Sequence, residues 1–412
     1  MVNGKKIFFF ILGGAFAFIL VSAEPTVKLS PVEELGKKLF FDTNLSSPPG
    51  QSCAVCHDPK AGWTGGTENP AGVYEGATKG RFGNRKPPSS AYAGGSPVFH
   101  VNKDGEFVGG MFWDGRATGG NWGDPLAEQA GGPFLNPLEH NFPDRKAVVL
   151  TVRKSDYAGL FEKVWTVKSE DWDARPDKLY EYICRAIAAY ERSAEVNPFD
   201  SKFDAFWRAA VAKSLRPESI SSDNIRRFEG LGLDAAELKG LVLFAGPAKC
   251  VNCHTLTPGP KQTCPVFTDF KYDNIGIPRN PRNPFYAMES SFNPDGKAWA
   301  DEGLGDYLKS VPRYASLAAA NVGKHKVPTL RNVDQRPSPG FVKVFGHNGV
   351  FQSLKEIVHF YNTRDFGKFP PPEVKANLNT EEMGNLGLTE ADEDALVVFL
   401  KTLTDGFVPD HR

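Results

Sequence analysis

The sequence predicts a mainly α-helical, loop-rich protein of two domains, and three observations support this prediction. A Cys-x-x-Cys-His motif occurs once in each half of the chain, at residues 53–57 and 250–254. Each motif follows a segment with the capping residues and apolar spacing of a helix, whereas strand-like alternation is scarce. Glycine (41 residues) and proline (32 residues) are abundant, which favours long ordered loops.

Composition narrows the class of protein. A chain of 412 residues with 41% apolar and 12% aromatic residues can bury the cores of two ordinary domains. The 48 basic and 49 acidic residues nearly cancel, and no basic run could follow a phosphate backbone. We therefore expect no nucleic-acid partner.

Residues 1–23 have the features of an export signal. Lys5 and Lys6 precede an apolar run at 7–21, and Ala23 ends a small-residue cleavage site. Cleavage predicts a periplasmic protein with no stable membrane insertion. The alternative is an uncleaved anchor, because the apolar run is near the short limit for a membrane span.

The segments before the two motifs repeat each other as predicted helices. Ser30 is an N-cap with Glu33 three residues later, and Asp234 and Glu237 stand in the same relation. Three further segments have helical capping and apolar spacing: 176–193, 353–362 and 388–403. We expect mostly irregular structure at 58–110 and 255–327.

The two motifs are typical of c-type haem attachment, in which both cysteines bind the porphyrin covalently and the histidine is the proximal ligand. A zinc site is less well supported, because each cysteine pair stands alone. The predicted haem-binding residues are Cys53, Cys56, His57, Cys250, Cys253 and His254. Cys184 and Cys264 remain, either as a disulfide or as two buried thiols.

What fills the opposite face of each iron decides between electron transfer and catalysis. No histidine lies between His57 and His100, so the first haem has no nearby loop ligand. For the second haem, Met288 is one candidate. Tyr361 is another, because it lies on the apolar face of the 353–362 helix, although a core tyrosine would have the same spacing.

The segments FWDGRA (112–117), QAGGPFLNPLEH (129–140) and VPTLRNV (327–333) add a family resemblance. With the two motifs in order, nearly all of the mature chain resembles the bacterial di-haem cytochrome c peroxidase superfamily. The resemblance implies two covalently bound haem c groups and hydrogen peroxide as substrate. The spacing from His347 places Tyr361 where ordinary peroxidases have a methionine ligand and MauG-type enzymes have tyrosine, which implies the metal ligands His57, His254 and Tyr361.

The resemblance also implies roles for four further residues. Trp113 matches a tryptophan that relays electrons between the haems, although it could be a core residue. Gln129, Pro133 and Glu139 match the pocket over the first haem, where a carboxyl group can move a proton between the peroxide oxygens. A solvated surface position is the alternative for Glu139.

Several departures from the family pattern bear on function. The first haem is expected to be permanently open, because the displaceable loop histidine of activatable members is absent. The family holds a calcium ion between the haems with the asparagine of an Arg-Asn pair, but Lys86 follows Arg85 here. Asn84 could substitute, which leaves the calcium open.

Three other departures concern single positions. Trp122 lies in an insertion and either approaches the pocket or only lengthens a loop, and His140 is expected to pack rather than ligate. Ala248 replaces the surface tryptophan that MauG uses for hole transfer. A donor would dock elsewhere or use one of four tryptophans: Trp165, Trp172, Trp207 and Trp299.

We therefore predict a MauG-like periplasmic di-haem peroxidase, with a peroxidatic haem domain at 24–220 and an electron-transfer haem domain at 221–412. The expected electron donor is a small cytochrome c or the Trp and Tyr side chains of a partner protein. The alternative is a non-catalytic di-haem electron-transfer cytochrome in which both irons are closed. A haem-based sensor would need an output domain, and the sequence shows none.

Overall fold

The computed structural model describes residues 28–66, 69–259 and 262–409. The predicted signal segment 1–23 and His411 lie outside these ranges. Within the described residues, no helix is both long enough and apolar enough to cross a membrane.

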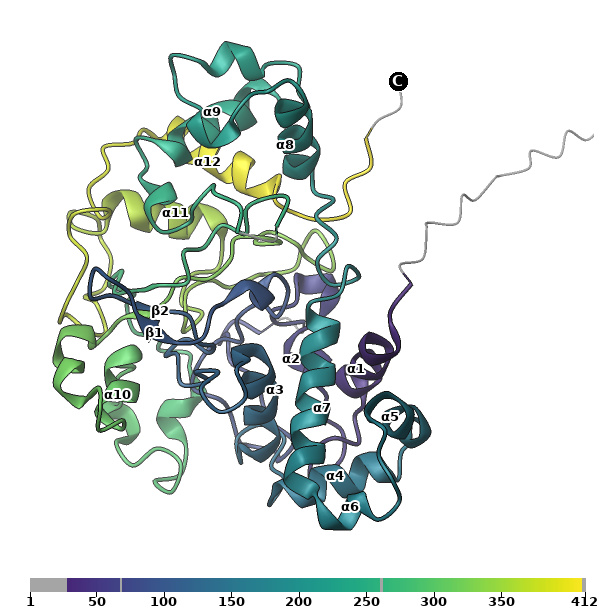
Figure 1. The fold of residues 1–412 in the computed structure, drawn as a ribbon. Helices are drawn as coiled ribbons and strands as arrows, with labels where there is room; N and C mark the ends of the chain where they lie inside the picture. The colour runs from purple at the N-terminus through teal and green to yellow at the C-terminus, as the bar shows by residue number, and fades with distance from the viewer. Residues whose placement is uncertain (1–27, 67–68, 260–261, 410–412) are drawn as a thin grey trace, which may run out of the picture.

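The N-terminal half is organised around the long helix α7 (Pro176–Glu191), against which α1 (Pro31–Phe41), α3 (Pro125–Leu135) and α4 (Arg145–Arg153) pack (Figure 1). Shorter helices complete this half: α2 (Cys53–Cys56), α5 (Ala158–Trp165) and α6 (Asp171–Ala174). The predicted cap of α1 is confirmed, since Glu33 Oε2 accepts from the Ser30 amide at 2.7 Å.

The C-terminal half is built on the pair α9 (Ala235–Ala245) and α12 (Glu390–Lys401), with α11 (Leu354–Thr363) packed against α12. These helices lie together at the top of Figure 1 with α8 (Lys202–Ala212). Phe203, Phe206 and Trp207 of α8 are buried in the same apolar cluster as α9 and α12, although α8 precedes the predicted boundary at residue 220. The boundary itself stays a prediction.

A glycine marks the same position in both repeated helices. A Cβ on Gly36 of α1 would lie 1.9 Å from the Ala186 carbonyl oxygen of α7, and one on Gly240 of α9 would lie 2.1 Å from that of Ala395 in α12. Only glycine permits such close approach of two helix backbones. The two haem-motif helices therefore dock on their partners in the same way.

Sheet structure is limited to two antiparallel pairs, in agreement with the scarcity of strand patterns. β1 (His100–Val101) pairs with β2 (Phe107–Val108), and β3 (Tyr272–Asp273) pairs with β4 (His325–Lys326). The predicted irregular segments otherwise contain α10 (Leu304–Lys309) and short 3-10 turns. The 3-10 helices of the described chain are η1 (Pro59–Ala61), η2 (Ala93–Gly95), η3 (Pro217–Ser219), η4 (Ile225–Phe228), η5 (Cys250–Asn252), η6 (Pro284–Ala287), η7 (Gly296–Ala298), η8 (Ala315–Leu317) and η9 (Ala319–Asn321).

Buried ion pairs tie distant segments together. Arg85 Nε and Nη2 bind both carboxylate oxygens of Asp301 at 2.6 and 2.7 Å, and its Nη1 binds Asp114 at 2.5 Å. Arg331 and Asp204 form a fully buried pair at 2.6 Å that fixes α8 to the loop after β4. These contacts hold the two halves around a shared interior.

Candidate active site

Both motif histidines are oriented by a backbone carbonyl. His57 Nδ1 lies 3.1 Å from the Trp63 oxygen, and His254 Nδ1 lies 2.8 Å from the Phe267 oxygen. A proton on Nδ1 leaves the Nε2 lone pair free to bind a metal, as is usual for histidine ligands. The arrangement fits a proximal iron ligand in both halves.

The two accepting residues share an unusual backbone conformation. Trp63 and Phe267 have positive φ angles of 62° and 55°, a region that bulky side chains seldom adopt. Such conformations persist where the surrounding structure requires them. In both motifs a carbonyl of a positive-φ aromatic residue orients the histidine, although that residue lies 6 positions after His57 and 13 positions after His254.

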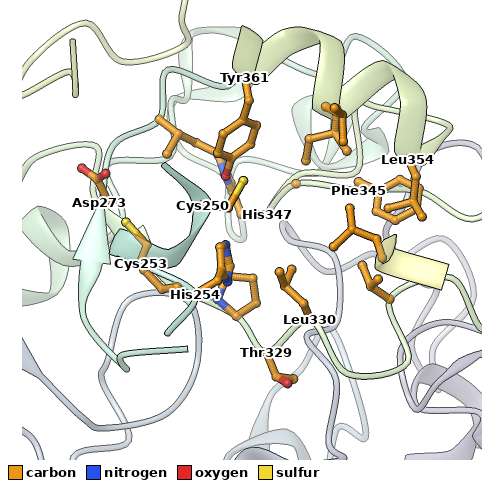
Figure 2. Close-up of a pocket in the computed structure, with 18 of the residues that line it drawn as sticks. Cys250, Cys253, His254, Asp273, Thr329, Leu330, Phe345, His347, Leu354 and Tyr361 are labelled. Atoms are coloured by element: carbon orange, nitrogen blue, oxygen red, sulfur yellow. The ribbon is translucent and has the colours of Figure 1, made fainter. Parts of the chain in front are cut away.

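A cavity of about 220 Å³ lies beside the second motif and is lined by Cys250, Cys253, His254 and Tyr361 (Figure 2). Leu330, Phe345, Leu354 and many further apolar side chains form its walls. In Figure 2 the Tyr361 ring points from α11 toward Cys250 and His254. An apolar cavity between a histidine and a second donor fits an enclosed haem.

Other possible donors line this cavity besides Tyr361, among them Met383, His325 and His347. Met383 is buried and also lines the wall, whereas Met288 does not line it. His359 of α11 points elsewhere, with its Nδ1 2.9 Å from Glu393 Oε1. Burial raises the pKa of the Tyr361 hydroxyl, so the phenol stays neutral unless a metal replaces its proton.

Three lysines lie on the polar part of the same wall: Lys343, which is buried, and Lys86 and Lys326, which are partly buried. Desolvation lowers the pKa of Lys86 to about 8 and that of Lys326 to about 7, and it lowers the pKa of Lys343 as well. No described carboxylate forms an ion pair with them. These ammonium groups therefore have no anionic partner in the described chain, and the two propionate groups of a haem could supply one.

At the first motif, Glu139 is partly buried and accepts a hydrogen bond from Asn136 Nδ2 at 2.9 Å. Desolvation raises the pKa of its carboxyl group, and the charge of Arg116 opposes this effect. Burial, followed by the charge of Glu139, raises the pKa of the Cys56 thiol to about 12. The predicted acid–base residue Glu139 is therefore near enough to Cys56 of the first motif for its charge to act on the thiol.

Gln129 and Pro133 lie one turn apart on α3, and the loop that carries Glu139 follows directly. Both are partly buried. No hydrogen bond in the described part of the chain joins Gln129 to Glu139, so their shared role stays a prediction.

Trp113 is 8% exposed and lines the cavity beside the second motif. Its Nε1 donates to the Lys86 carbonyl oxygen at 2.7 Å, and its ring lies 6.4 Å from that of His347 in an edge-on arrangement. The indole is thus fixed at the junction between the loop after the first motif and the wall of the second haem cavity.

Lys86, which the resemblance places at the family's calcium-binding asparagine, does not fit a calcium ligand. Lys86 Nζ donates to Thr64 Oγ1 at 2.5 Å and to the Pro87 oxygen at 3.3 Å, and the Lys86 amide donates to the His347 oxygen. Calcium needs six to eight oxygen ligands. An ammonium group supplies none and repels the ion.

Other positions singled out in the sequence are occupied by side chains that pack in the protein interior. His140 is buried, with Nδ1 on the Leu45 oxygen and its ring against Phe134. The Trp122 amide donates to Glu128 Oε1 at 2.9 Å, and the Trp122 side chain packs against the buried cluster that contains Leu126 and Ala127. Cys184 and Cys264 are separate buried thiols rather than a disulfide.

The four candidate tryptophans occupy different environments. Trp165 stacks on Tyr182 with ring centroids 4.4 Å apart, and Trp172 and Trp207 are buried. Trp299 is partly exposed and contacts Tyr286. Ala248 lines the cavity beside the second motif.

Sequence reasoning missed Asn136 and Arg116, which orient and electrostatically tune Glu139. The Asn-Pro pair at 136–137 is a turn signal that could have drawn attention to Asn136. Arg116 lies within the segment 112–117 that carries the resemblance, but no local pattern links it to Glu139.

Comparison with known proteins agrees with this geometry. A family model described as di-haem cytochrome c peroxidase matches residues 30–212. The methylamine utilization protein MauG of Paracoccus denitrificans is 34% identical, covering 94% of this chain and 93% of its own. The cytochrome-c peroxidase IdrP1 of Denitromonas iodatirespirans is 27% identical, covering 90% of this chain and 80% of its own.

A solved structure is also similar. The diheme peroxidase BthA from Burkholderia thailandensis superimposes with a TM-score of 0.71 at 29% identity, covering 92% of this chain and 89% of its own. The loop-rich helical fold and its two repeated motifs are those of di-haem c-type proteins. The chain belongs to the di-haem cytochrome c peroxidase superfamily, in its MauG-like subgroup.

Proposed function

We propose that this protein is a periplasmic di-haem peroxidase that carries one covalently bound haem c in each of the units 24–220 and 221–412. His57 would hold the peroxidatic haem, and His254 with Tyr361 would hold the second. Haem iron with an open face supplies the two-electron reduction of hydrogen peroxide. The predicted signal at 1–23 supports export to the periplasm.

Glu139 would move the proton in this reaction. Its carboxylate accepts the proton of one peroxide oxygen and delivers it to the other oxygen, which then leaves as water. Its raised pKa makes it a better proton acceptor than a solvated carboxylate. Asn136 holds Oε1 in place, and Gln129 would donate a hydrogen bond to the peroxide.

Tyr361 would distinguish the second haem from that of ordinary peroxidases. A phenolate ligand places negative charge on the iron and favours high oxidation states, whereas methionine favours the reduced state. The second haem would therefore store an oxidising equivalent, with Trp113 as the connection between the two haems. The donor would be a small cytochrome c or the Trp and Tyr side chains of a partner protein.

The contrast between the two sites carries this proposal. A carboxyl group lies near the first motif, and a tyrosine faces the histidine of the second. A di-haem electron-transfer cytochrome, the alternative, needs strong ligands on both faces of both irons.

Electron paramagnetic resonance of the ferric holoprotein separates the two functions. We expect one high-spin and one low-spin haem, and rapid spectral change at both after stoichiometric hydrogen peroxide. Tyr361→Phe should alter the low-spin signal, with Met383→Leu as the matched control. Two low-spin haems whose spectra do not change after hydrogen peroxide would identify an electron carrier instead.

A further inference from the structure

A pair of aromatic residues lies outside the haem cavity, where η6 and η7 pack together. The rings of Tyr286 and Trp299 have centroids 5.9 Å apart, and the ring of Phe285 also packs on Trp299, with centroids 4.8 Å apart. Tyr286 and Trp299 are both partly exposed. A docked molecule can therefore reach them from solvent.

The hydroxyl group of Tyr286 reaches a buried carboxylate. Tyr286 Oη donates to Glu373 Oε1 at 3.2 Å, and the Glu373 side chain is only 4% exposed. Within the described residues, Glu373 Oε2 has no hydrogen-bond partner. It lies 4.0 Å from His347 Nε2, which also lacks a partner there.

His347 connects this group to the haem cavity. Its ring lines the cavity wall and lies 6.4 Å from the ring of Trp113. It also stacks on His325 with centroids 3.6 Å apart. Trp113, His347, Glu373 and Tyr286 thus form a continuous series of neighbours from the haem junction to the surface.

We propose that Tyr286 is a surface redox relay that loses one electron through His347 and Trp113 while its phenolic proton passes to Glu373. The inference rests on the proposed function, because the electron acceptor is the di-haem centre after its oxidation by hydrogen peroxide. The O–H bond of Tyr286 breaks, an O–H bond forms on Glu373, and the haem centre is reduced by one equivalent.

The resulting neutral tyrosyl radical would take an electron from an electron-rich phenol or indole side chain of a docked protein. The proton then returns from Glu373 to the Tyr286 oxygen. Tyr286 would be the exit for oxidising equivalents in a chain whose position 248 is alanine.

The charges around Tyr286 favour proton-coupled oxidation over simple electron loss. The Arg279 guanidinium lies 3.9 Å from the ring centroid, which disfavours a cationic ring. Burial and the charge of Asp301 raise the pKa of the Glu373 carboxyl group, which makes it a stronger base. Arg279 also donates to the Trp299 carbonyl oxygen at 2.9 Å and fixes the pair.

The test is freeze-quench electron paramagnetic resonance of the holoprotein after hydrogen peroxide, with ring-deuterated tyrosine to assign the signal. Haem oxidation is followed in parallel by optical absorption. The variants are Tyr286→Phe and Glu373→Gln. Tyr314→Phe is the matched control, since Tyr314 also lies under an arginine, Arg313 at 4.6 Å, but its hydroxyl has no carboxylate partner in the described chain.

We expect a tyrosyl radical in the wild type and in Tyr314→Phe, with at least a tenfold lower yield in Tyr286→Phe and Glu373→Gln, while haem oxidation is retained in all four proteins. Tyramine labelling with mass spectrometry should place the adduct on Tyr286. Equal radical yield in Tyr286→Phe with normal haem oxidation would overturn the relay alone. A wild-type haem centre that does not respond to peroxide would overturn the proposed function and the relay with it.

Discussion

At the scale of single residues, the environment of Glu139 determines the chemistry that the first site can perform. Its carboxyl group is desolvated, accepts from Asn136 and lies near Cys56. Surface glutamates are far more common than such positions. Since the pattern 129–140 is compatible with either, the structure supplies the burial that separates them.

Replacing Glu139 with glutamine should slow haem oxidation by hydrogen peroxide roughly 10²–10⁴-fold, because the amide cannot accept the peroxide proton. The unprotonated carboxylate is the active form, and its pKa is raised. The wild-type rate should therefore fall on the acid side of a midpoint above the usual 4.5. Stopped-flow absorption across pH measures both effects.

Glu106→Gln, a change at an exposed loop carboxylate, is the control and should leave rate and profile unchanged. If the rate of Glu139→Gln fell at low pH as the wild-type rate does, Glu139 would not be the proton acceptor.

Lys86 leads to a prediction about metal removal. Because its ammonium group occupies the family's calcium-ligand position, the holoprotein should contain no stoichiometric calcium, and a chelator should leave its melting temperature unchanged. Lys86→Asn removes the charge and restores an oxygen ligand. That variant should bind one calcium and become sensitive to the chelator.

Elemental analysis and differential scanning calorimetry, with and without chelator, decide the question. One calcium per wild-type chain, lost to the chelator together with thermal stability, would show that Asn84 or another residue holds the ion after all.

At the scale of elements, α7 combines a predicted apolar stripe with one residue that the pattern does not explain. Leu179, Ile183 and Ile187 are buried as predicted. Glu191 at the end of the helix is also buried, 3% exposed, and its Oε2 has no partner within the described residues. A helix pattern identifies which face is apolar, but not whether a terminal carboxylate is covered by neighbouring segments.

Glu191 should make stability depend on pH. Burial, opposed by Arg192 and assisted by Asp124, raises its pKa from 4.5 to about 8. Between these values the folded protein binds more protons than the unfolded chain, so the free energy of unfolding falls as pH rises. Calorimetry should show that the melting temperature of Glu191→Gln rises relative to that of the wild type as the pH increases from about 5 to about 8.

A melting-temperature difference that stays constant over this range would mean that Glu191 is ionised throughout. Glu195→Gln would be a poor control, since Glu195 is partly buried, pairs with Lys37 and accepts a hydrogen bond from Tyr190 of α7. Glu218→Gln, in a surface pair with Arg216, is better suited.

At the scale of the whole molecule, Arg85 joins segments that the sequence keeps far apart. Its guanidinium binds Asp114 in the N-terminal half and Asp301 in the C-terminal half, and all three side chains are buried or nearly so. Removing the cation deprives the buried Asp301 carboxylate of its guanidinium partner, whereas Asp114 keeps its pair with Arg116 at 2.7 Å. Such losses are large because the remaining charges cannot reach solvent.

Arg85→Met should therefore lower the free energy of unfolding by about 3–5 kcal/mol. We also expect calorimetry to show one transition in the wild type and two in this variant, because the halves lose their connection. Arg153→Met breaks an exposed pair with Asp173 and should cost less than about 1 kcal/mol. Similar losses in both variants would mean that Arg85 does not link the halves.

The local signals in this sequence were sufficient for the helices, the two haem motifs and the apolar face that carries Tyr361. Capping boxes and apolar spacing act within a few residues, and a Cys-x-x-Cys-His motif is complete in five. The structure contains α1, α7, α9, α11 and α12 where these signals predict them. The roles of Gln129, Pro133 and Trp113 came from resemblance and stay predictions.

Only the tertiary structure decided which distant residues meet. Lys86 touches Thr64 and His347, Arg85 reaches Asp301, and Tyr286 reaches Glu373 across 87 positions of the chain. No short-range pattern encodes these pairs, because loops fix them only once both cores have packed. The sequence by itself thus predicted two haem-binding motifs, whereas the charges around them and the neighbours of Tyr286 depend on how the two halves fold together.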